Sequence, residues 1–181
     1  MSRRDGLRAL IAGHTPADER EAGFVDAMGA LLEVGGDPFS RGFFTPGHFT
    51  ASAFVLSPDE RALLLVFHGK LHRWLQPGGH IDPEDIDVVA AAKREVSEEV
   101  GIDRVEVLGN GLFDVDIHDI PSLRGDPEHR HYDLRLLLRS PSMAFTAGSD
   151  AKAAKWVELD QIASVDTDES VLRAVRKLAA R

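Results

Sequence analysis

The sequence predicts an α+β protein, an α/β/α sandwich in which helices cover a mixed sheet. Short apolar runs with strand character, separated by turn residues, occupy much of the chain. Helical periodicity is confined to a few segments, and strands and helices follow one another in a mixed order. Hydrophobic residues make up 43% of the 181 positions, which is ample for one packed core. We therefore expect one main domain with a terminal extension.

The N-terminal part, residues 1–46, is predicted to be a helical extension of a domain that spans residues 47–181. Thr15 is a candidate helix cap, and Pro16 suits a first helical turn. The following helix carries one apolar stripe, formed by Phe24, Met28, Leu31 and Leu32. Because such a stripe needs a partner, we expect the extension to pack on the main domain or on a second subunit.

The main domain is predicted to begin with a hairpin formed by residues 48–57 and 61–68. A short strand and a glycine loop follow in residues 69–79. A helix is predicted over residues 87–100, with Gly101 at its C-terminal end and an apolar face of Val89, Ala92, Val96 and Val100. Further strands are predicted within residues 104–120, 131–139 and 154–159, and short helices near residues 159–163 and 169–180.

Charge and composition exclude several classes of function. The net charge of −9 disfavours nucleic acid as a bulk partner, because the protein and the phosphate backbone repel each other. The chain contains no cysteine, which excludes disulfides, thiolate zinc sites and thiol nucleophiles. No signal peptide and no membrane segment are expected, since no apolar run is long enough. These features favour a cytoplasmic protein that acts without a membrane.

The most informative residues are three acids in the second half of the predicted helix over residues 87–100. Glu95, Glu98 and Glu99 are spaced by three and four residues, which places their carboxylates on one helix face. Three like charges repel each other unless a cation lies among them, and Mg²⁺ or Mn²⁺ prefers such oxygen ligands. Arg94 is four residues before Glu98 and can orient it. Taken alone, the string would favour a solvated acidic helix face, but its combination with the glycine loop before it and Gly101 after it is much more specific.

The stretch from Gly78 to Ile102 resembles the box of the Nudix hydrolase family, G-x5-E-x7-R-E-U-x-E-E-x-G-U, where U is a bulky aliphatic residue. The second half matches without a gap from Arg94 to Ile102. In the first half, Gly79 plus five residues leads to Asp85, where the family has glutamate. Eight residues then separate Asp85 from Arg94, which indicates a one-residue insertion.

The resemblance implies hydrolysis of a phosphoanhydride bond by a metal-activated water, in a nucleoside diphosphate linked to another group or in a related small diphosphate. By position, Glu95, Glu98 and Glu99 would hold Mg²⁺ or Mn²⁺, with the Gly78 carbonyl as a further ligand. Arg94 would assist catalysis. The general base is expected to be Glu98 first and Asp150 second, although an acid beside Gly148 is also typical of a turn.

A second group of polar residues alternates along the predicted strand over residues 131–139. His129, His131, Asp133 and Arg135 share one face, which could face substrate or hold a second metal through its two histidines. A plain exposed strand face is slightly favoured. His80 follows the box glycines and is expected near the substrate. The remaining candidates for phosphate contacts are Arg41, Lys70 and Arg73.

Other functions fit the chain less well. An enzyme similar to isopentenyl diphosphate isomerase would share the layout but would need a catalytic cysteine. A non-catalytic, Nudix-like module that senses a nucleotide would typically lack box acids, whereas this chain keeps all three. A purely structural acidic domain would tolerate alanine at Glu95. Substrate identity stays open among nucleoside triphosphates, ADP-ribose-like sugars, dinucleoside polyphosphates and coenzyme A, and so does the choice between monomer and homodimer.

Overall fold

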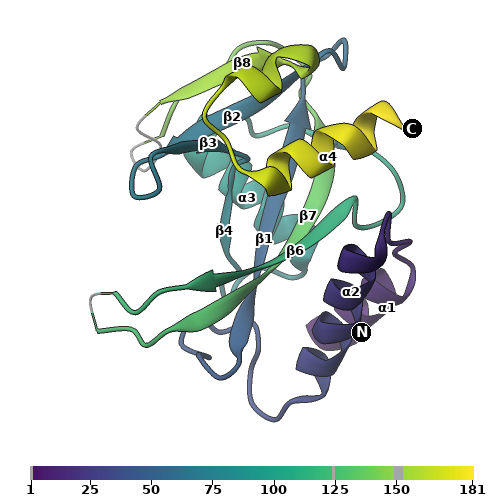
Figure 1. Ribbon diagram of the computed structural model, residues 1–181, viewed down its shortest axis with the longest axis vertical. Helices are drawn as coiled ribbons and strands as arrows, with labels where there is room; N and C mark the ends of the chain where they lie inside the picture. Colours follow the sequence, from purple (N-terminus) through teal and green to yellow (C-terminus); the bar gives the residue numbers. More distant parts are fainter. Residues whose placement is uncertain (1, 124, 149–152) are drawn as a thin grey trace. The chain divides into compact units, whose positions relative to one another are not determined.

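The computed structural model describes residues 2–123, 125–148 and 153–181 (Figure 1). Its elements in chain order are α1 (Arg3–Ala12), α2 (Glu19–Glu33), β1 (Gly47–Leu56), β2 (Ala62–His68), β3 (Arg73–Leu75), β4 (Gly78–His80), α3 (Val88–Val100), β5 (Glu106–Val107), β6 (Asp114–Ile120), β7 (His129–Arg139), β8 (Ala154–Glu158), the 3₁₀ helix η1 (Leu159–Ser164) and α4 (Glu169–Ala179). No helix among the described residues has the length and apolar character needed to cross a bilayer.

The strands form a mixed sheet, which confirms the predicted α+β class. Hydrogen bonding links them in the order β3-β2-β1-β7-β5, with β4 beside β1, β6 beside β7 and β8 beside β2. The chain divides into two compact units, here called the first unit and the second unit. The first unit comprises Met1–Ala51, Gly79–Ala92 and Gly111–Leu136, and the second unit comprises Ser52–Gly78, Lys93–Asn110 and Leu137–Arg181.

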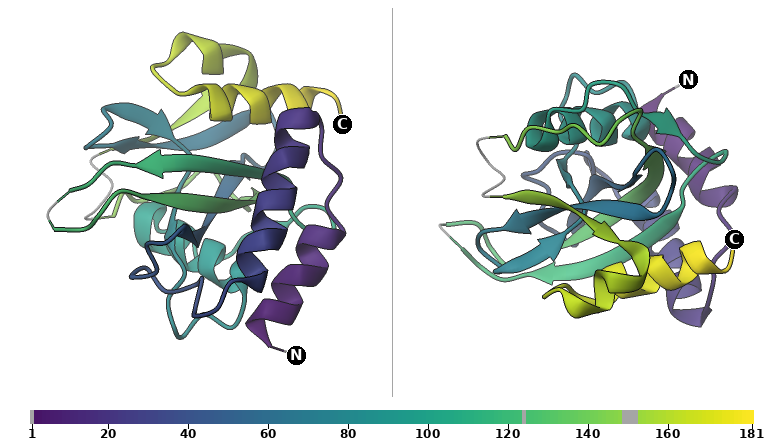
Figure 2. Two further views of the ribbon diagram at one scale, coloured as in Figure 1. Left: turned by 60° about the horizontal axis from the view of Figure 1, so that its bottom comes forward. Right: turned by 90° about the horizontal axis from the view of Figure 1, so that it is seen from above.

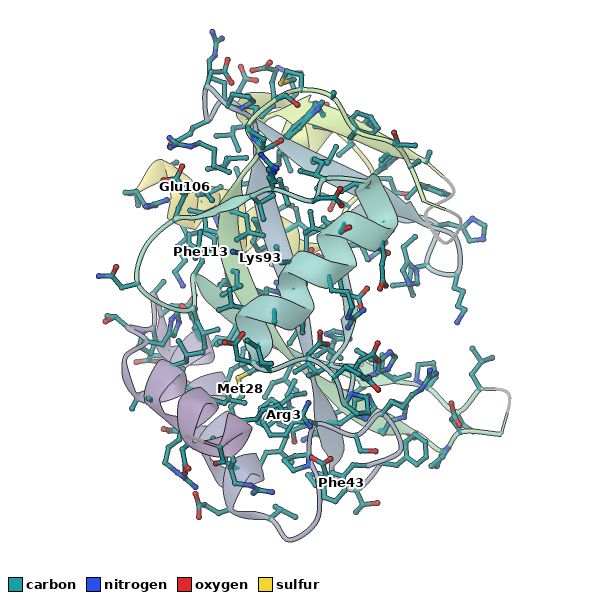
Figure 3. All side chains as sticks on the ribbon, turned by 180° about the vertical axis from the view of Figure 1, so that it is seen from behind. Arg3, Met28, Phe43, Lys93, Glu106 and Phe113 are labelled. Atoms are coloured by element: carbon teal, nitrogen blue, oxygen red, sulfur yellow. The ribbon has the colours of Figure 1, made fainter. Side chains whose placement is uncertain are left out.

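The first unit contains the N-terminal helices and the β6–β7 ribbon. Ser2 caps α1 and Asp18 caps α2, each through a side-chain oxygen that accepts a backbone N–H. α2 packs on α1 and on β6, and the buried side chains of the two helices include Leu7, Met28 and Leu31. Met28 points inward from α2 in Figure 3. The prediction that the N-terminal helix packs through its apolar stripe is therefore confirmed within this unit.

The second unit contains β2 between β3 and β8, with the end of β1 paired alongside. Val55 pairs with Leu64 in the predicted hairpin, and Leu64 also pairs with Trp156 of β8. The C-terminal half of α3 lies on one face of these strands, and η1 and α4 lie on the other (Figure 2). This layering of helix, sheet and helix agrees with the predicted sandwich.

Three local predictions need correction. α1 is not predicted from the sequence, since only Leu7 and Ile11 of its ten residues are buried and the others are half-buried or exposed. Asp18 caps α2 instead of Thr15, because its carboxylate accepts the Glu21 N–H at 2.8 Å. In α3 the buried face contains Val88, Ala91, Ala92, Val96 and Val100, whereas Val89 is half-buried.

Candidate functional site

The C-terminal half of α3 carries the three glutamates, and its packing fixes the face on which they lie. Val96 and Val100 are fully buried, so the residues between them point away from the core. Gly101 ends the helix with a φ of +65°, a conformation that favours glycine. Its N–H donates to the Ser97 carbonyl at 2.9 Å and closes the last helical turn.

Arg94 holds two of the three carboxylates. Its Nη1 donates to Glu95 Oε1 at 2.9 Å and to Glu98 Oε2 at 3.1 Å, so the predicted contact between Arg94 and Glu98 is present. The Glu95 side chain is 13% exposed and that of Glu98 is 58% exposed. The Arg94 guanidinium therefore contacts both the largely buried carboxylate of Glu95 and the exposed carboxylate of Glu98, and the latter remains accessible to solvent.

The third carboxylate joins the helix to the glycine loop. The Gly78 N–H donates to Glu99 Oε2 at 3.0 Å, within the second unit. The prediction that the acids meet the glycine segment is confirmed for Glu99, and the divalent-ion site between them stays a prediction. Three carboxylates on one face with a single arginine leave an excess of negative charge, and they offer only oxygen donors. This donor set fits a hard divalent cation such as Mg²⁺ or Mn²⁺.

The segment before residue 149 is bound to the same helix end. The Thr146 N–H donates to the Val100 carbonyl at 2.9 Å, and the Gly148 N–H donates to the Glu99 carbonyl at 2.7 Å. These bonds satisfy carbonyls that a helix C-terminus leaves without intrahelical partners. Asp150, the second candidate base, lies outside the described residues.

The polar face of β7 is mostly buried, whereas the favoured interpretation of the sequence is an exposed strand face. An exposed strand face was expected, but His129 is 8% exposed, Asp133 4% and Arg135 2%. That interpretation is wrong, because alternation along a strand separates its two faces without saying what covers each one. His131 is half-buried, and its imidazole lies near the rings of His48 and His80.

Arg135 lies in a buried charge cluster of the first unit. It donates to Asp133 at 2.8 Å, to Asp114 at 3.2 Å and to Asp116 at 3.4 Å. Burial disfavours its charged form, but the three carboxylates outweigh burial and raise the pKa of Arg135. Thr50 Oγ1 donates to the other oxygen of Asp133 at 3.0 Å. Arg135 therefore compensates buried carboxylates, which removes most of its capacity to bind a substrate from solution.

The remaining predicted residues are distributed over both units. His80 lies in the first unit beside His48, with ring centroids 5.2 Å apart. Arg73 lies in the second unit, where its side chain is 51% exposed and its Nε is 3.9 Å from Asp166. Lys70 and Arg41 are exposed in the second and first unit, respectively. Asp85, which replaces the box glutamate, is buried and accepts the Asp82 N–H at 2.8 Å.

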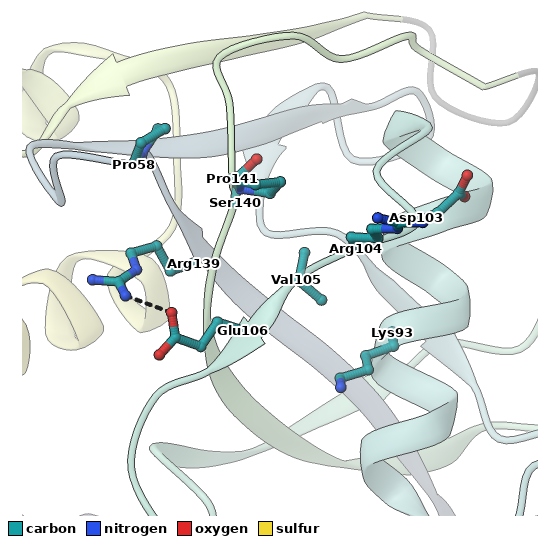
Figure 4. A pocket seen from close by; sticks show the side chains of 9 residues that line it. All are labelled: Pro58, Lys93, Asp103, Arg104, Val105, Glu106, Arg139, Ser140 and Pro141. Carbon is teal, nitrogen blue, oxygen red and sulfur yellow. Dashed lines mark hydrogen bonds and ion pairs between the residues drawn. The ribbon is translucent and has the colours of Figure 1, made fainter.

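The second unit also has a cleft beside α3 with several charged residues in its lining, drawn in Figure 4. Lys93, Arg104 and Arg139 contribute cationic groups to its lining. Arg139 forms ion pairs with Glu60 and Glu106, so part of this charge is already compensated. None of the three box glutamates lines the cleft, and we assign it no role in catalysis.

Comparison with known proteins gives a consistent assignment. The model of the NUDIX domain family matches residues 46–178. A NUDIX-family hydrolase from Clostridium perfringens has a similar fold, with a TM-score of 0.57 and 23% identity over 74% of this chain and 97% of that one. An Ap4A hydrolase from C. elegans gives a TM-score of 0.55 and 20% identity over 73% and 95% of the two chains.

The NUDIX domain of Shewanella oneidensis NrtR, solved with ADP ribose, gives a TM-score of 0.51 and 19% identity over 74% of this chain and 86% of that one. No curated protein matches the sequence. The identities are low, so these solved structures support the fold alone.

Proposed function

Because the chain belongs to the NUDIX family and is a Nudix-type pyrophosphohydrolase, we propose that it uses Mg²⁺ or Mn²⁺ to cleave a small diphosphate compound. The substrate class is a nucleoside diphosphate linked to another moiety, or a related diphosphate. Glu95, Glu98 and Glu99 are the proposed metal ligands, with the Gly78 carbonyl as a further one. The observation that carries the proposal is the bond from the Gly78 N–H to Glu99 Oε2, which joins the glycine loop to the acidic helix face.

The chemistry of the site follows from its charges. A bound divalent cation supplies electrostatic stabilisation of the diphosphate oxygens and lowers the pKa of water. Glu98 is the first choice for the group that takes the proton from this water, because it is the more exposed of the two carboxylates that Arg94 contacts. Arg94 orients Glu98 and balances part of the negative charge before the cation binds. Asp150 is the second choice.

A non-catalytic role in nucleotide sensing is the second candidate. The structure of the NrtR domain with ADP ribose shows that this fold can bind such a ligand. The three box glutamates favour hydrolysis over sensing, because a sensor has no need for a cluster of metal-binding carboxylates. A metal-dependent assay separates the two functions.

The proposal also includes a location and an assembly state. We place the protein in the cytoplasm, as a monomer or homodimer that acts on small molecules and not on bulk nucleic acid or at a membrane. The net charge of −9 and the lack of cysteine support this placement. Light scattering during size-exclusion chromatography measures the assembly state directly.

The test is a screen of diphosphate compounds with Mg²⁺ and Mn²⁺, in which products are identified by mass. Glu99→Gln keeps the side-chain shape but removes a charge, so turnover of the identified substrate should fall by about 10²-fold. Excess Mn²⁺ should restore part of this loss. Glu33→Gln is the matched control, since Glu33 is 69% exposed and pairs with Arg8 on the N-terminal helices. Equal turnover of Glu99→Gln and the wild type across a Mg²⁺ titration would contradict the metal site.

A further inference from the structure

Three histidines from separate segments meet in the first unit. His48 belongs to β1, His80 ends β4 and His131 belongs to β7. One ligand nitrogen from each lies within 4.8 Å of the other two. The ring centroids are 5.2 Å apart for His48 and His80, 4.7 Å for His48 and His131, and 5.2 Å for His80 and His131. Three imidazoles in one place form a nitrogen donor set that is chemically distinct from the carboxylates of α3.

His48 presents an unsatisfied nitrogen. Its side chain is fully buried, and its Nδ1 lies 3.2 Å from the Phe43 carbonyl oxygen. A carbonyl only accepts, so Nδ1 carries the hydrogen and Nε2 has the lone pair. Nε2 is buried and has no hydrogen-bond partner among the described residues. Leaving a buried acceptor without a partner costs about 1–3 kcal/mol, whereas a metal ion would satisfy it.

A hydrogen-bond chain orients His131 in the same way. His129 Nδ1 lies 2.8 Å from the Pro127 carbonyl oxygen and must donate to it. In neutral His129, Nε2 is then an acceptor, and it lies 3.3 Å from His131 Nε2. His131 therefore donates from Nε2 and keeps its lone pair on Nδ1. Metal-binding histidines typically donate their second N–H in this manner, which fixes the tautomer and the ring orientation.

The protonation states agree with this arrangement. Burial lowers the pKa of His48 to about 4 and that of His131 to about 2, and it also lowers the pKa of His80. Burial therefore favours the neutral form of the three rings, which is the form that binds a metal ion. Arg41 adds positive charge near His48 and His80, which opposes a cation. The negative charges of Asp82 and Asp126 act in the opposite direction, because they raise the pKa of His80.

We propose that His48, His80 and His131 bind one divalent transition metal ion of the zinc class. Imidazole nitrogens suit Zn²⁺ and Co²⁺, whereas Mg²⁺ prefers oxygen. Tetrahedral Zn²⁺ with bonds of about 2.0–2.1 Å holds its ligands about 3.4 Å apart, so binding draws the rings together. His80 and His131 are half-buried, whereas His48 is buried. Three protein ligands leave a fourth position for water or an anionic oxygen, and the positive charge of Arg41 that acts on His48 and His80 would favour an anion there.

The experiment uses the full chain without a histidine tag, after removal of metals with EDTA and dialysis. Co²⁺ is added first, because its visible absorption reports coordination number. Zn²⁺ affinity is then measured by competition with a chromophoric chelator. We expect one Zn²⁺ per chain, no displacement by excess Mg²⁺, and a Co²⁺ spectrum typical of four or five ligands.

Variants assign the site. His80→Asn should lower the affinity for Zn²⁺ by more than about 10-fold. Loss of a residue that only hydrogen-bonds a metal ligand already lowers metal affinity by about 10-fold or more, and loss of a ligand itself should cost at least as much. His72→Asn is the matched control, because His72 is exposed and lies in the second unit. The double variant Glu95→Gln/Glu99→Gln should retain the bound Zn²⁺, which separates this site from the proposed hydrolase site. Unchanged affinity in folded His80→Asn, or loss of Zn²⁺ binding in the double variant, would overturn the proposal.

Discussion

The N–H of Gly148 donates a hydrogen bond of 2.7 Å to the carbonyl oxygen of Glu99. The approach is so close that a Cβ added at Gly148 would lie 2.0 Å from the Glu98 carbonyl oxygen. The carbonyl oxygens of Glu98 and Glu99 belong to the backbone of α3, which cannot move aside as a flexible side chain can. Glycine is therefore required where the segment preceding residue 149 meets the helix that carries the three glutamates.

Gly148→Ala should separate this segment from α3. We expect the free energy of unfolding to fall by about 1–3 kcal/mol, as for other overpacked sites, and turnover to fall with it. Gly29→Ala is the control, because a Cβ there meets no atom within 4 Å and alanine stabilises a helix interior by about 0.5–1 kcal/mol. Urea denaturation measures both variants. A Gly148→Ala midpoint equal to that of the wild type would show that the contact is not retained in solution.

The general base can be identified from the dependence of the rate on pH. Glu98→Gln should reduce turnover by about 10²–10⁴-fold and change the acidic limb of the profile, because the proton acceptor is lost. Asp150→Asn should leave metal affinity near that of the wild type and change turnover less. If Asp150→Asn produces the larger loss and the altered profile, the base is Asp150 and Glu98 acts as a metal ligand alone.

The buried histidines should make the metal-free protein sensitive to acid. The folded state holds the pKa of His48 near 4, below its ordinary value of 6.5, so the unfolded state binds more protons between these values. Stability therefore falls as the pH decreases from about 6.5 towards 4, and the full effect of His48 amounts to about 3 kcal/mol. Denaturation in EDTA at several pH values measures it. A flat profile of the metal-free wild type between these pH values would contradict the burial of His48.

The N-terminal helices should contribute to stability through their buried face. Leu7 is 1% exposed, so Leu7→Ala should lower the free energy of unfolding by about 2–5 kcal/mol. Arg8→Ala, one residue further on the exposed side of α1, should change it by less than about 1 kcal/mol. Deletion of residues 1–40 should lower the melting temperature and the solubility, because it exposes the surface that these helices cover. An unchanged melting curve after the deletion would rule out a structural role.

Periodicity predicted most of the elements, because each depends on local patterns. The helix expected over residues 87–100 is observed at Val88–Val100, and the strand expected over residues 61–68 is observed at Ala62–His68. The helix α1 was missed because its stability depends on packing of Leu7 and Ile11 against residues that follow later in the chain. A short helix with only two buried positions has too weak a periodic signal of its own.

The two groups of site residues differ in how far sequence could predict them. Glu95, Glu98 and Glu99 share one helix, so their spacing alone places them together. His48, His80 and His131 come from three strands, and only the pairing of those strands brings them within reach of one another. The burial of Arg135 likewise depends on Asp114, which the register of β6 and β7 places opposite it.

The packing of α2 on β6 has a consequence for synthesis of the protein. The ribosome completes α1 and α2 first, but the strand that α2 contacts ends only at Ile120. At about 5–20 residues per second, the intervening stretch of about 90 residues takes roughly 5–20 s to translate. During that interval the face of α2 that packs on β6 lacks its final neighbour and offers an apolar surface to chaperones. Nascent chains arrested before β6 emerges should therefore be cut by protease within the N-terminal helices, whereas the released protein should resist cleavage there.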